Sequence, residues 1–233
     1  MKESKLNRKV FVEGVGGVAA IAITILLSPI LRRWYSRWGA TDAEVKRSFP
    51  GDEAVRHPKS ELTCAITIHA PAVQVWPWFV QLGCQRGGWY SYDLLDNGGI
   101  PSADRIIPEY QHLEVGDMVP AVPNGSFGFP VAAIEWGKTL TLAGTLNTST
   151  GKPADPNEPG LATYFSGDQT FSVDALGEEE SRLFFRMRTD WNPGSLNTLI
   201  YRGIIEPVSL VMGRKMLLNI KKRAEALVGQ RTA

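Results

Sequence analysis

Apolar and polar residues alternate along several stretches of the chain, and this alternation predicts β-strands. The clearest case runs over residues 62–69, where the apolar positions are Leu62, Cys64, Ile66 and Ile68. A period of two is typical of a strand with one buried face. Further strands are predicted over residues 117–122, 127–136, 139–145, 170–175 and 182–190. Short turns join several of them, so we expect an antiparallel sheet.

Helical spacing of apolar residues predicts a short helix and a long one. The short helix carries Val75 and Phe79 and is expected to end by Gly83, with Pro77 implying a kink or a later start. The long helix runs from about residue 206 to 228, and its apolar face is formed by Met212, Met216, Leu217, Ile220, Ala224 and Leu227. That face must be buried, and the sheet is the only large partner. The predicted fold class is therefore α+β, an antiparallel sheet closed over a long C-terminal helix.

The N-terminal region has a different pattern. A basic tail over residues 1–9 precedes an apolar run over residues 10–31, which is long enough for a transmembrane helix. Arg32 and Arg33 end the run beside Trp34, as at a membrane interface. A cleaved signal peptide and a buried core helix are the alternatives. No small-x-small cleavage site follows the run before Arg32, and a helix that is apolar nearly all round has no face for solvent. A single-pass anchor is therefore favoured.

The anchor hypothesis divides the chain into a tail (1–9), a transmembrane helix (10–31), a linker (32–61) and one folded domain (62–233). It predicts that the bilayer is a partner and that the chain lies in a cell membrane. Basic residues flank the apolar run on both sides, so the positive-inside rule gives no orientation. They are Lys2, Lys5, Arg8 and Lys9 before it, and Arg32, Arg33, Arg37, Lys46 and Arg47 after it.

The charge balance argues against nucleic acid as a partner. The chain has 25 Lys and Arg against 24 Asp and Glu, a net charge of +1, whereas nucleic-acid binders usually show a clustered basic face. Cys64 and Cys84 lie in apolar settings without CxxC spacing, and we interpret them as buried thiols. No zinc-protease, nucleophile-elbow or phosphate-loop motif is present. No metal and no cofactor is expected.

The segment Ala65–Pro71 and the following Val75-Trp76 are similar to a sequence pattern of a known family. A strand ending in Ile-x-Ala-Pro before a Val-Trp helix resembles the opening of the START-like (SRPBCC) superfamily, which includes polyketide cyclases, birch-pollen-type proteins and lipid-transfer domains. The segments Arg86–Asp93 and Ala103–Ile106 are similar to a bacterial, membrane-anchored branch described as polyketide cyclase or dehydrase-like. The matching stretches of this branch are Trp38–Thr41, Pro50–Glu53, Arg86–Asp93 and Ala103–Ile106.

The resemblance covers the chain from about Trp38 to the C-terminus. It implies a helix-grip fold, in which a curved sheet holds the C-terminal helix and leaves a cavity between them. It implies no single activity, because the superfamily holds enzymes, carriers and adaptors.

The segment Arg86–Asp93 supplies the main candidate site. Gly87 and Gly88 permit a tight backbone, and Trp and Tyr combine a large apolar face with one polar tip. They can form a ligand wall or simply close the end of the core. Asp93 can instead cap the next short helix. The ligand-binding candidates are Trp89, Tyr90, Tyr92, Phe127, Phe129, Met212 and Met216, and the weaker catalytic candidates are Tyr90, Tyr92 and Asp93.

Three functional hypotheses follow. The first is a non-catalytic module that binds a hydrophobic or amphipathic small molecule, lipid or polyketide-like, at the membrane. The second is a cyclase or dehydratase acting on an aromatic substrate. The third is an adaptor that contacts a protein through the long loop at 147–162.

Arg186 and Arg188 are expected on the outer face of the sheet, solvated and paired with acids of neighbouring strands. A one-residue register shift would place them in the cavity.

Overall fold

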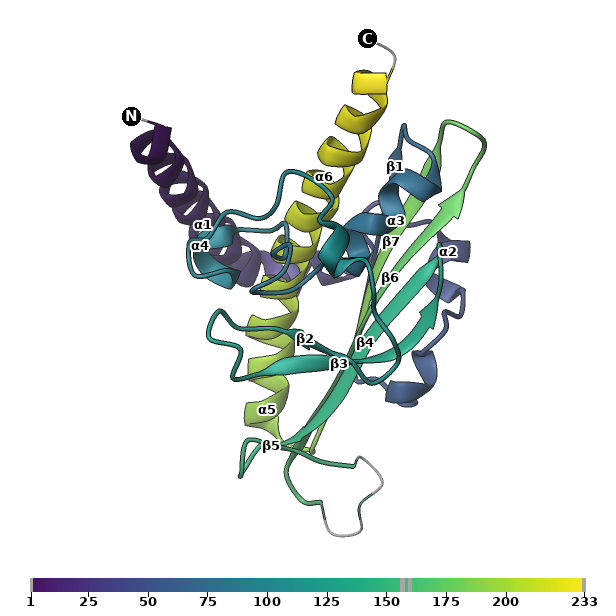
Figure 1. Ribbon diagram of the computed structural model, residues 1–233. Coiled ribbons are helices and arrows are strands. Elements are labelled where there is room, and N and C mark those ends of the chain that lie inside the picture. The colour runs from purple at the N-terminus through teal and green to yellow at the C-terminus, as the bar shows by residue number, and fades with distance from the viewer. Residues whose placement is uncertain (1, 156–157, 159–160, 232–233) are drawn as a thin grey trace.

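The computed structural model describes residues 2–155, 158 and 161–231, with side chains for 6–155, 158 and 161–229. It shows a curved, seven-stranded antiparallel sheet that wraps around one long C-terminal helix (Figure 1). The strand order is β1-β7-β6-β4-β3-β2, with β5 paired to β4. The predicted α+β class and its helix-grip arrangement are therefore confirmed.

The strands lie close to their predicted positions. They are β1 (Ser60–Ile68), β2 (Met118–Pro120), β3 (Gly128–Glu135), β4 (Thr139–Asn147), β5 (Lys152–Pro153), β6 (Tyr164–Ala175) and β7 (Ser181–Trp191). The main difference is β6, which begins six residues before the predicted start at 170 and pairs with β7 from Phe165 to Ala175. The predicted long loop at 147–162 contains β5, and its residues 156, 157, 159 and 160 lie outside the described part of the chain.

The helices are α1 (Lys2–Tyr35), α2 (Asp42–Lys46), α3 (Ala72–Val80), α4 (Asp93–Asp96), α5 (Ser195–Ile200) and α6 (Glu206–Arg231). Single turns also form at η1 (Asp52–Val55), η2 (Pro108–Tyr110) and η3 (Tyr201–Ile205). η3 is a π-helical turn that joins α5 to α6. The C-terminal helical segment therefore begins at Ser195, earlier than the apolar stripe indicated, although α6 itself starts at the predicted residue.

The core lies between the concave face of the sheet and α6. Alternate residues of β4, β6 and β7 point inward and are buried, namely Leu140, Leu142, Phe171, Val173, Leu183 and Phe185. Met216, Leu217 and Ile220 of α6 meet them from the other side. The period-two and helical patterns of the sequence thus face one another as predicted.

The outer face of the sheet is covered by the segment that joins α1 to β1. Arg186 and Arg188 point to this face as predicted, but the expectation that they are solvated is wrong. The Arg186 guanidinium donates to the carbonyl oxygens of Glu44 and Val45 and lies 3.1 Å from Asp52 Oδ2. Arg188 donates to the carbonyl oxygen of Val55. The two arginines are buried because this covering segment (42–55) supplies the acceptors that water would otherwise provide.

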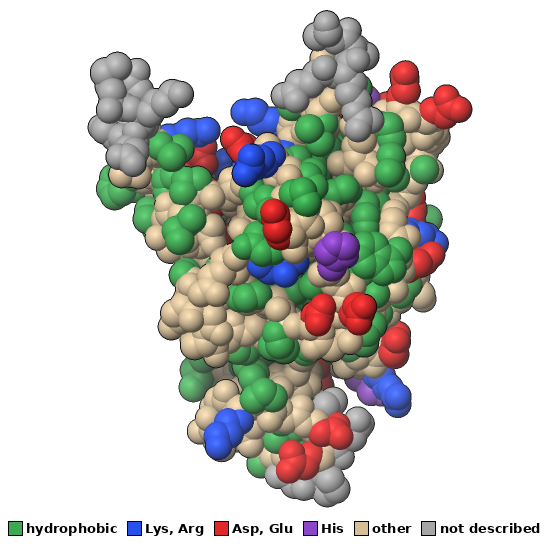
Figure 2. Space-filling view, viewed as in Figure 1, with side chains coloured by type: hydrophobic (Ala, Val, Ile, Leu, Met, Phe, Trp, Pro, Cys, Tyr) green, Lys and Arg blue, Asp and Glu red, His purple; other side chains and the backbone are tan. Residues whose placement is uncertain are grey.

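Helix α1 extends beyond the predicted span at both ends and packs against α4 and α6 (Figure 1). Arg32 makes a bidentate ion pair with the buried Glu206, at 2.9 and 3.0 Å, and Ser60 also donates to that carboxylate. Near the other end, Glu13 lies 3.5 Å from Lys215. Apolar side chains remain exposed along much of α1 (Figure 2).

Candidate functional site

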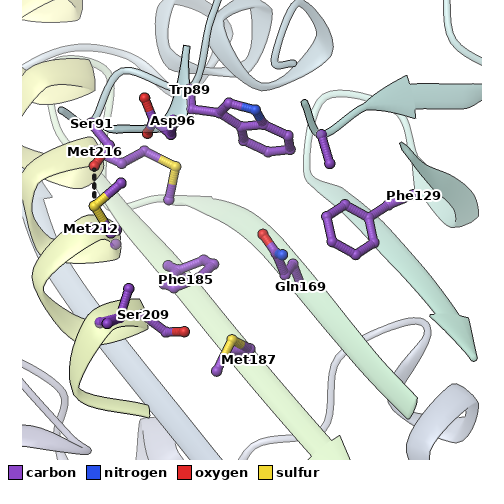
Figure 3. A pocket seen from close by; sticks show the side chains of 13 residues that line it. Trp89, Ser91, Asp96, Phe129, Gln169, Phe185, Met187, Ser209, Met212 and Met216 are labelled. Atoms are coloured by element: carbon purple, nitrogen blue, oxygen red, sulfur yellow. Dashed lines mark hydrogen bonds between the residues drawn. The ribbon is translucent and has the colours of Figure 1, made fainter. Parts of the chain in front are cut away.

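A cavity of about 190 Å³ lies between α6 and the sheet (Figure 3). On the helix side it is lined by Val208, Ser209, Met212, Gly213 and Met216. At Gly213 an added Cβ would lie 2.5 Å from the Phe185 ring, so glycine allows α6 to approach the sheet closely here. The two methionines contribute flexible apolar surface that can adapt to different ligand shapes.

The sheet forms the opposite wall. Phe129 of β3, Gln169 of β6, and Phe185 and Met187 of β7 line the cavity. Gln169 and Met187 are cross-strand partners, which places the amide beside apolar neighbours on the inward face. The Phe185 ring stacks on Phe171 at 5.4 Å between centroids, which fixes this part of the wall.

The third wall comes from loops and α4, which contribute Trp89, Ser91, Asp96 and Ala121. The backbone before this wall is tight, as the glycines predicted: Gly88 has φ +82°, and an added Cβ would meet the Ser102 side chain at 2.4 Å. Tyr90 also has a positive φ, +57°. This unusual backbone directs Trp89 toward the cavity and Tyr90 into the core.

Asp96 is the one carboxyl side chain that lines this cavity. Its Oδ1 is buried and has no hydrogen-bond partner among the described residues. Burial, with a further contribution from nearby Asp93, raises the pKa of Asp96 to about 7, and the Ser91 hydroxyl offsets part of that rise. A carboxyl group with this pKa exchanges a proton near neutral pH, so the cavity holds a group that can accept or donate one.

Sequence reasoning did not select Asp96. Asp93 and Asp96 both lie in α4, and no motif or spacing distinguishes them in the run Asp93–Asn97. The Asp93 carboxylate accepts a hydrogen bond from Ser102 Oγ at 2.5 Å, and Asp93 is not among the residues that line the cavity. Asp93 does not cap α4 with its side chain either, since the N-cap residue is Tyr92.

The structure brings together four of the sequence-predicted site residues and places the others elsewhere. Trp89, Phe129, Met212 and Met216 all line the cavity. Phe127 does not line the cavity, but its ring contacts that of Phe129, with 5.2 Å between the centroids. Tyr92 packs against α1, where an added Cβ on Gly17 would meet its ring at 2.8 Å.

Tyr90 is buried in the core beside the cavity. Its hydroxyl accepts a hydrogen bond from Gln81 Nε2, and its ring packs edge-on against Trp78. The Arg223 guanidinium lies over the ring at 4.9 Å. Burial raises the pKa of Tyr90 to about 12, so this phenol stays protonated at neutral pH. These contacts give Tyr90 a packing role at the end of the core.

A second hollow of about 310 Å³ lies on the other side of the sheet, between η1 and the ends of β6 and β7. It is lined by Glu53, Ala54, Val55, Arg56, His57, Tyr164, Ser166 and Asp190. Ligand sites are usually apolar and carry few polar groups. The cavity beside α6 fits that description better. Among the described residues, no group of three or more His, Cys, Asp or Glu side chains is placed to hold a metal ion.

Comparison with solved structures finds similar arrangements at low sequence identity. The Zhui aromatase/cyclase from a Streptomyces species is 13% identical, with a TM-score of 0.34, and covers 72% of this chain and 95% of that one. A norcoclaurine synthase mutant from Thalictrum flavum is 14% identical, with a TM-score of 0.38, and covers 75% and 96%. A protein from Arthrobacter aurescens is 14% identical, with a TM-score of 0.38, and covers 78% and 92%.

No protein-family model matches the chain, and no characterised protein matches its sequence. At these TM-scores the likeness to solved structures carries no argument about function. The description of the fold as a helix-grip arrangement rests on this chain's own sheet order and its enclosed C-terminal helix.

Proposed function

We propose that this chain is a membrane-anchored protein that binds a small hydrophobic or amphipathic molecule between its sheet and α6. The observation that carries the proposal is the cavity of about 190 Å³, with aromatic and methionine walls and few polar groups. An apolar cavity of about 150 Å³ is large enough to hold benzene. The volume therefore suits a molecule of about one aromatic ring with a short side chain better than a long-chain lipid.

A pair of volume-filling substitutions tests this proposal. Ala121→Phe places a ring in the cavity, and Ala54→Phe places the same ring in the outer hollow as a matched control. Calorimetric titration of the full chain in uncharged detergent micelles with ethylbenzene is the assay. We expect binding in the wild type and in Ala54→Phe, and loss of binding in Ala121→Phe. Absence of binding in the folded wild type contradicts the proposal.

Membrane anchoring is proposed for α1. Residues Leu6–Tyr35 have a mean hydropathy of 2.3 and form the one described helix that is long and apolar enough to cross a membrane. Thirty residues of helix span about 45 Å, against about 30 Å of bilayer hydrocarbon. A helix that lies flat on a membrane needs a charged face, and within residues 10–31 the only charged residue is Glu13. A single pass through a bacterial cell membrane therefore suits α1 best.

If α1 crosses a membrane, part of the helix must separate from α4 and α6, against which it packs. Its ion pairs through Glu13 and Arg32 lie 19 residues apart, about 28 Å along the helix, which is nearly the bilayer thickness. The contacts of Gly14 with Leu94 and of Gly17 with Tyr92 must then open in a membrane, whereas the Arg32–Glu206 pair can remain at the interface.

Disulfide cross-linking tests this arrangement. The pair Gly14→Cys, Leu94→Cys joins positions that touch in the docked state. The control pair Ser36→Cys, Thr63→Cys joins backbones hydrogen-bonded at 2.8 Å beyond the span. In lipid nanodiscs we expect cross-linking of the control pair only. Equal cross-linking of both pairs means that α1 stays docked and does not span.

One observation favours a second candidate, a cyclase or dehydratase that acts on an aromatic substrate. Asp96 lines the cavity with a pKa of about 7, which suits a general acid or base at neutral pH. Tyr90, Tyr92 and Asp93 do not line the cavity, so this candidate depends on Asp96. Turnover of an aromatic β-hydroxyketone to its enone is the assay. A fall of about 100-fold or more in Asp96→Asn, but not in Asp93→Asn, supports it.

A further inference from the structure

The polar groups of the cavity differ in whether they already have partners. Ser209 Oγ donates to the carbonyl oxygen of Ile205 at 2.8 Å, and Ser91 Oγ donates to Met212 Sδ at 3.5 Å (Figure 3). Asp96 Oδ1 is buried without a partner among the described residues. Buried acceptors are almost always hydrogen-bonded in folded proteins. A ligand in the cavity can supply the partner that the Asp96 carboxylate lacks, and the Gln169 amide is a further polar group of the lining that it can meet.

The charge of Asp96 is also uncompensated. None of the ion pairs within the described part of the chain includes Asp96, and the nearby charge that acts on it is the carboxylate of Asp93. Ionising a carboxyl in an apolar cavity is costly unless a cation pairs with it. A ligand with a positive charge near this oxygen lowers that cost, and a neutral ligand does not.

The rest of the lining suits the apolar body of such a ligand. Figure 3 shows Trp89 above the space and Phe129 and Phe185 at opposite sides of it, with the Gln169 side chain between these two rings. Aromatic faces attract cations and also stack with other rings. Among the thirteen lining residues there is no Lys or Arg that would repel a cation.

We propose that the cavity binds a small arylalkyl amine, with its ammonium group on the Asp96 carboxylate and its ring between Trp89, Phe129 and Phe185. This inference rests on the proposed binding function and names its ligand class. The ammonium group pairs with the Asp96 carboxylate, and no covalent step is involved. Volume sets the size limit, since about 190 Å³ leaves room for one ring and a short chain.

Three probes that differ only in the polar end test the inference. Phenethylamine, 2-phenylethanol and ethylbenzene are titrated into the full chain in uncharged detergent micelles at pH 8, where the amine is protonated. We expect the wild type to bind the amine at least tenfold more tightly than the alcohol. In Asp96→Asn this preference disappears, while binding of the alcohol and of ethylbenzene changes less than threefold. In the control Asp93→Asn, which alters a carboxylate outside the cavity lining, the preference remains.

The outcomes separate this inference from the function on which it rests. If ethylbenzene and the alcohol bind but the amine binds no better in the wild type, the amine assignment is wrong and the binding function stands. If no probe binds to folded protein, both are wrong. If Asp96→Asn retains the full amine preference, Asp96 is not the anchor. The wild-type comparison decides the ligand class by itself, even if the variant fails to fold.

Discussion

The isosteric substitution Asp96→Asn is expected to stabilise the ligand-free protein at high pH and to have little effect at low pH. In the folded chain burial raises the pKa of Asp96 from an ordinary value of 3.8 to about 7. Between these two values the folded state holds a proton that the unfolded state has released. Stability of the wild type therefore falls as the pH rises from about 4 to about 7. Asparagine never ionises, so the variant lacks this loss.

The size of the effect follows from the shift. About three pKa units, at about 1.4 kcal/mol each, set an upper limit of about 4 kcal/mol. The cavity is partly open, and water that enters it screens the charge, so we expect the variant to be more stable by about 2–3 kcal/mol at pH 8. At pH 4 both folded side chains are neutral, but about half of the unfolded wild-type chains carry an ionised Asp96, so the expected difference is about 0.5 kcal/mol.

Urea unfolding of the full chain in uncharged detergent, followed by tryptophan fluorescence at pH 4, 6 and 8, measures the free energy of unfolding of both proteins. Asp168 is also buried, and its pKa is raised to about 8, but it is present in both proteins and cancels in the difference. Equal stabilities at pH 8, or a difference that does not change between pH 4 and pH 8, would refute a buried, ionising Asp96.

Three further substitutions test the packing around the site. Gly213→Ala should lower the free energy of unfolding by about 1–3 kcal/mol, because its Cβ would lie 2.5 Å from the Phe185 ring. The measurement is the thermal unfolding midpoint, which should fall. An unchanged midpoint means that α6 is not in close contact with the sheet at this position. Arg186→Ala should lower the free energy of unfolding by about 3–5 kcal/mol, because Asp52 and backbone carbonyl groups lose a buried partner. It should also expose the segment 42–55 to limited proteolysis. Unchanged cleavage argues against the view that this segment is held on the sheet by Arg186. Tyr90→Phe should lower the free energy of unfolding by about 1 kcal/mol, because the hydrogen bond from Gln81 is lost. The affinity for ethylbenzene should not change. A large loss of affinity would mean that Tyr90 contacts the ligand directly.

The elements of the core could be predicted from the sequence because each has a periodic pattern. Leu183, Phe185 and Met187 alternate along β7, and Met212 and Met216 recur at helical spacing on α6. Such patterns fix which face each element buries. The same patterns predicted Phe129, Met212 and Met216, because a helix-grip cavity is bounded by the inward faces of the sheet and the helix, whereas Trp89 was predicted from the glycine-containing segment Arg86–Asp93.

Features that depend on irregular segments could not be predicted in this way. Arg186 and Arg188 show the outward alternation of an exposed face, but the segment that buries them has no periodic pattern of its own. Asp96 is similar, because its approach to the cavity follows from how the irregular stretch after α3 folds back onto α6. Charged residues are rarely buried without a partner, so a sequence pattern assigns such a residue to the surface by default.

An amine at Asp96 would reverse the pH dependence on which the first prediction rests. Pairing with an ammonium group favours the ionised carboxylate and lowers the pKa of Asp96 from its value of about 7 in the empty cavity. The complex then forms best where the carboxylate is ionised and the amine is still protonated, so its affinity rises through pH 7 as the free protein loses stability. A ligand that binds only the folded state adds stability that grows with the logarithm of its affinity. The stabilisation produced by phenethylamine should therefore grow between pH 5 and 8, whereas that produced by ethylbenzene, which carries no charge, should follow no such trend. The ionised carboxyl group that lowers the stability of the ligand-free protein is thus the group through which a cationic ligand would raise it.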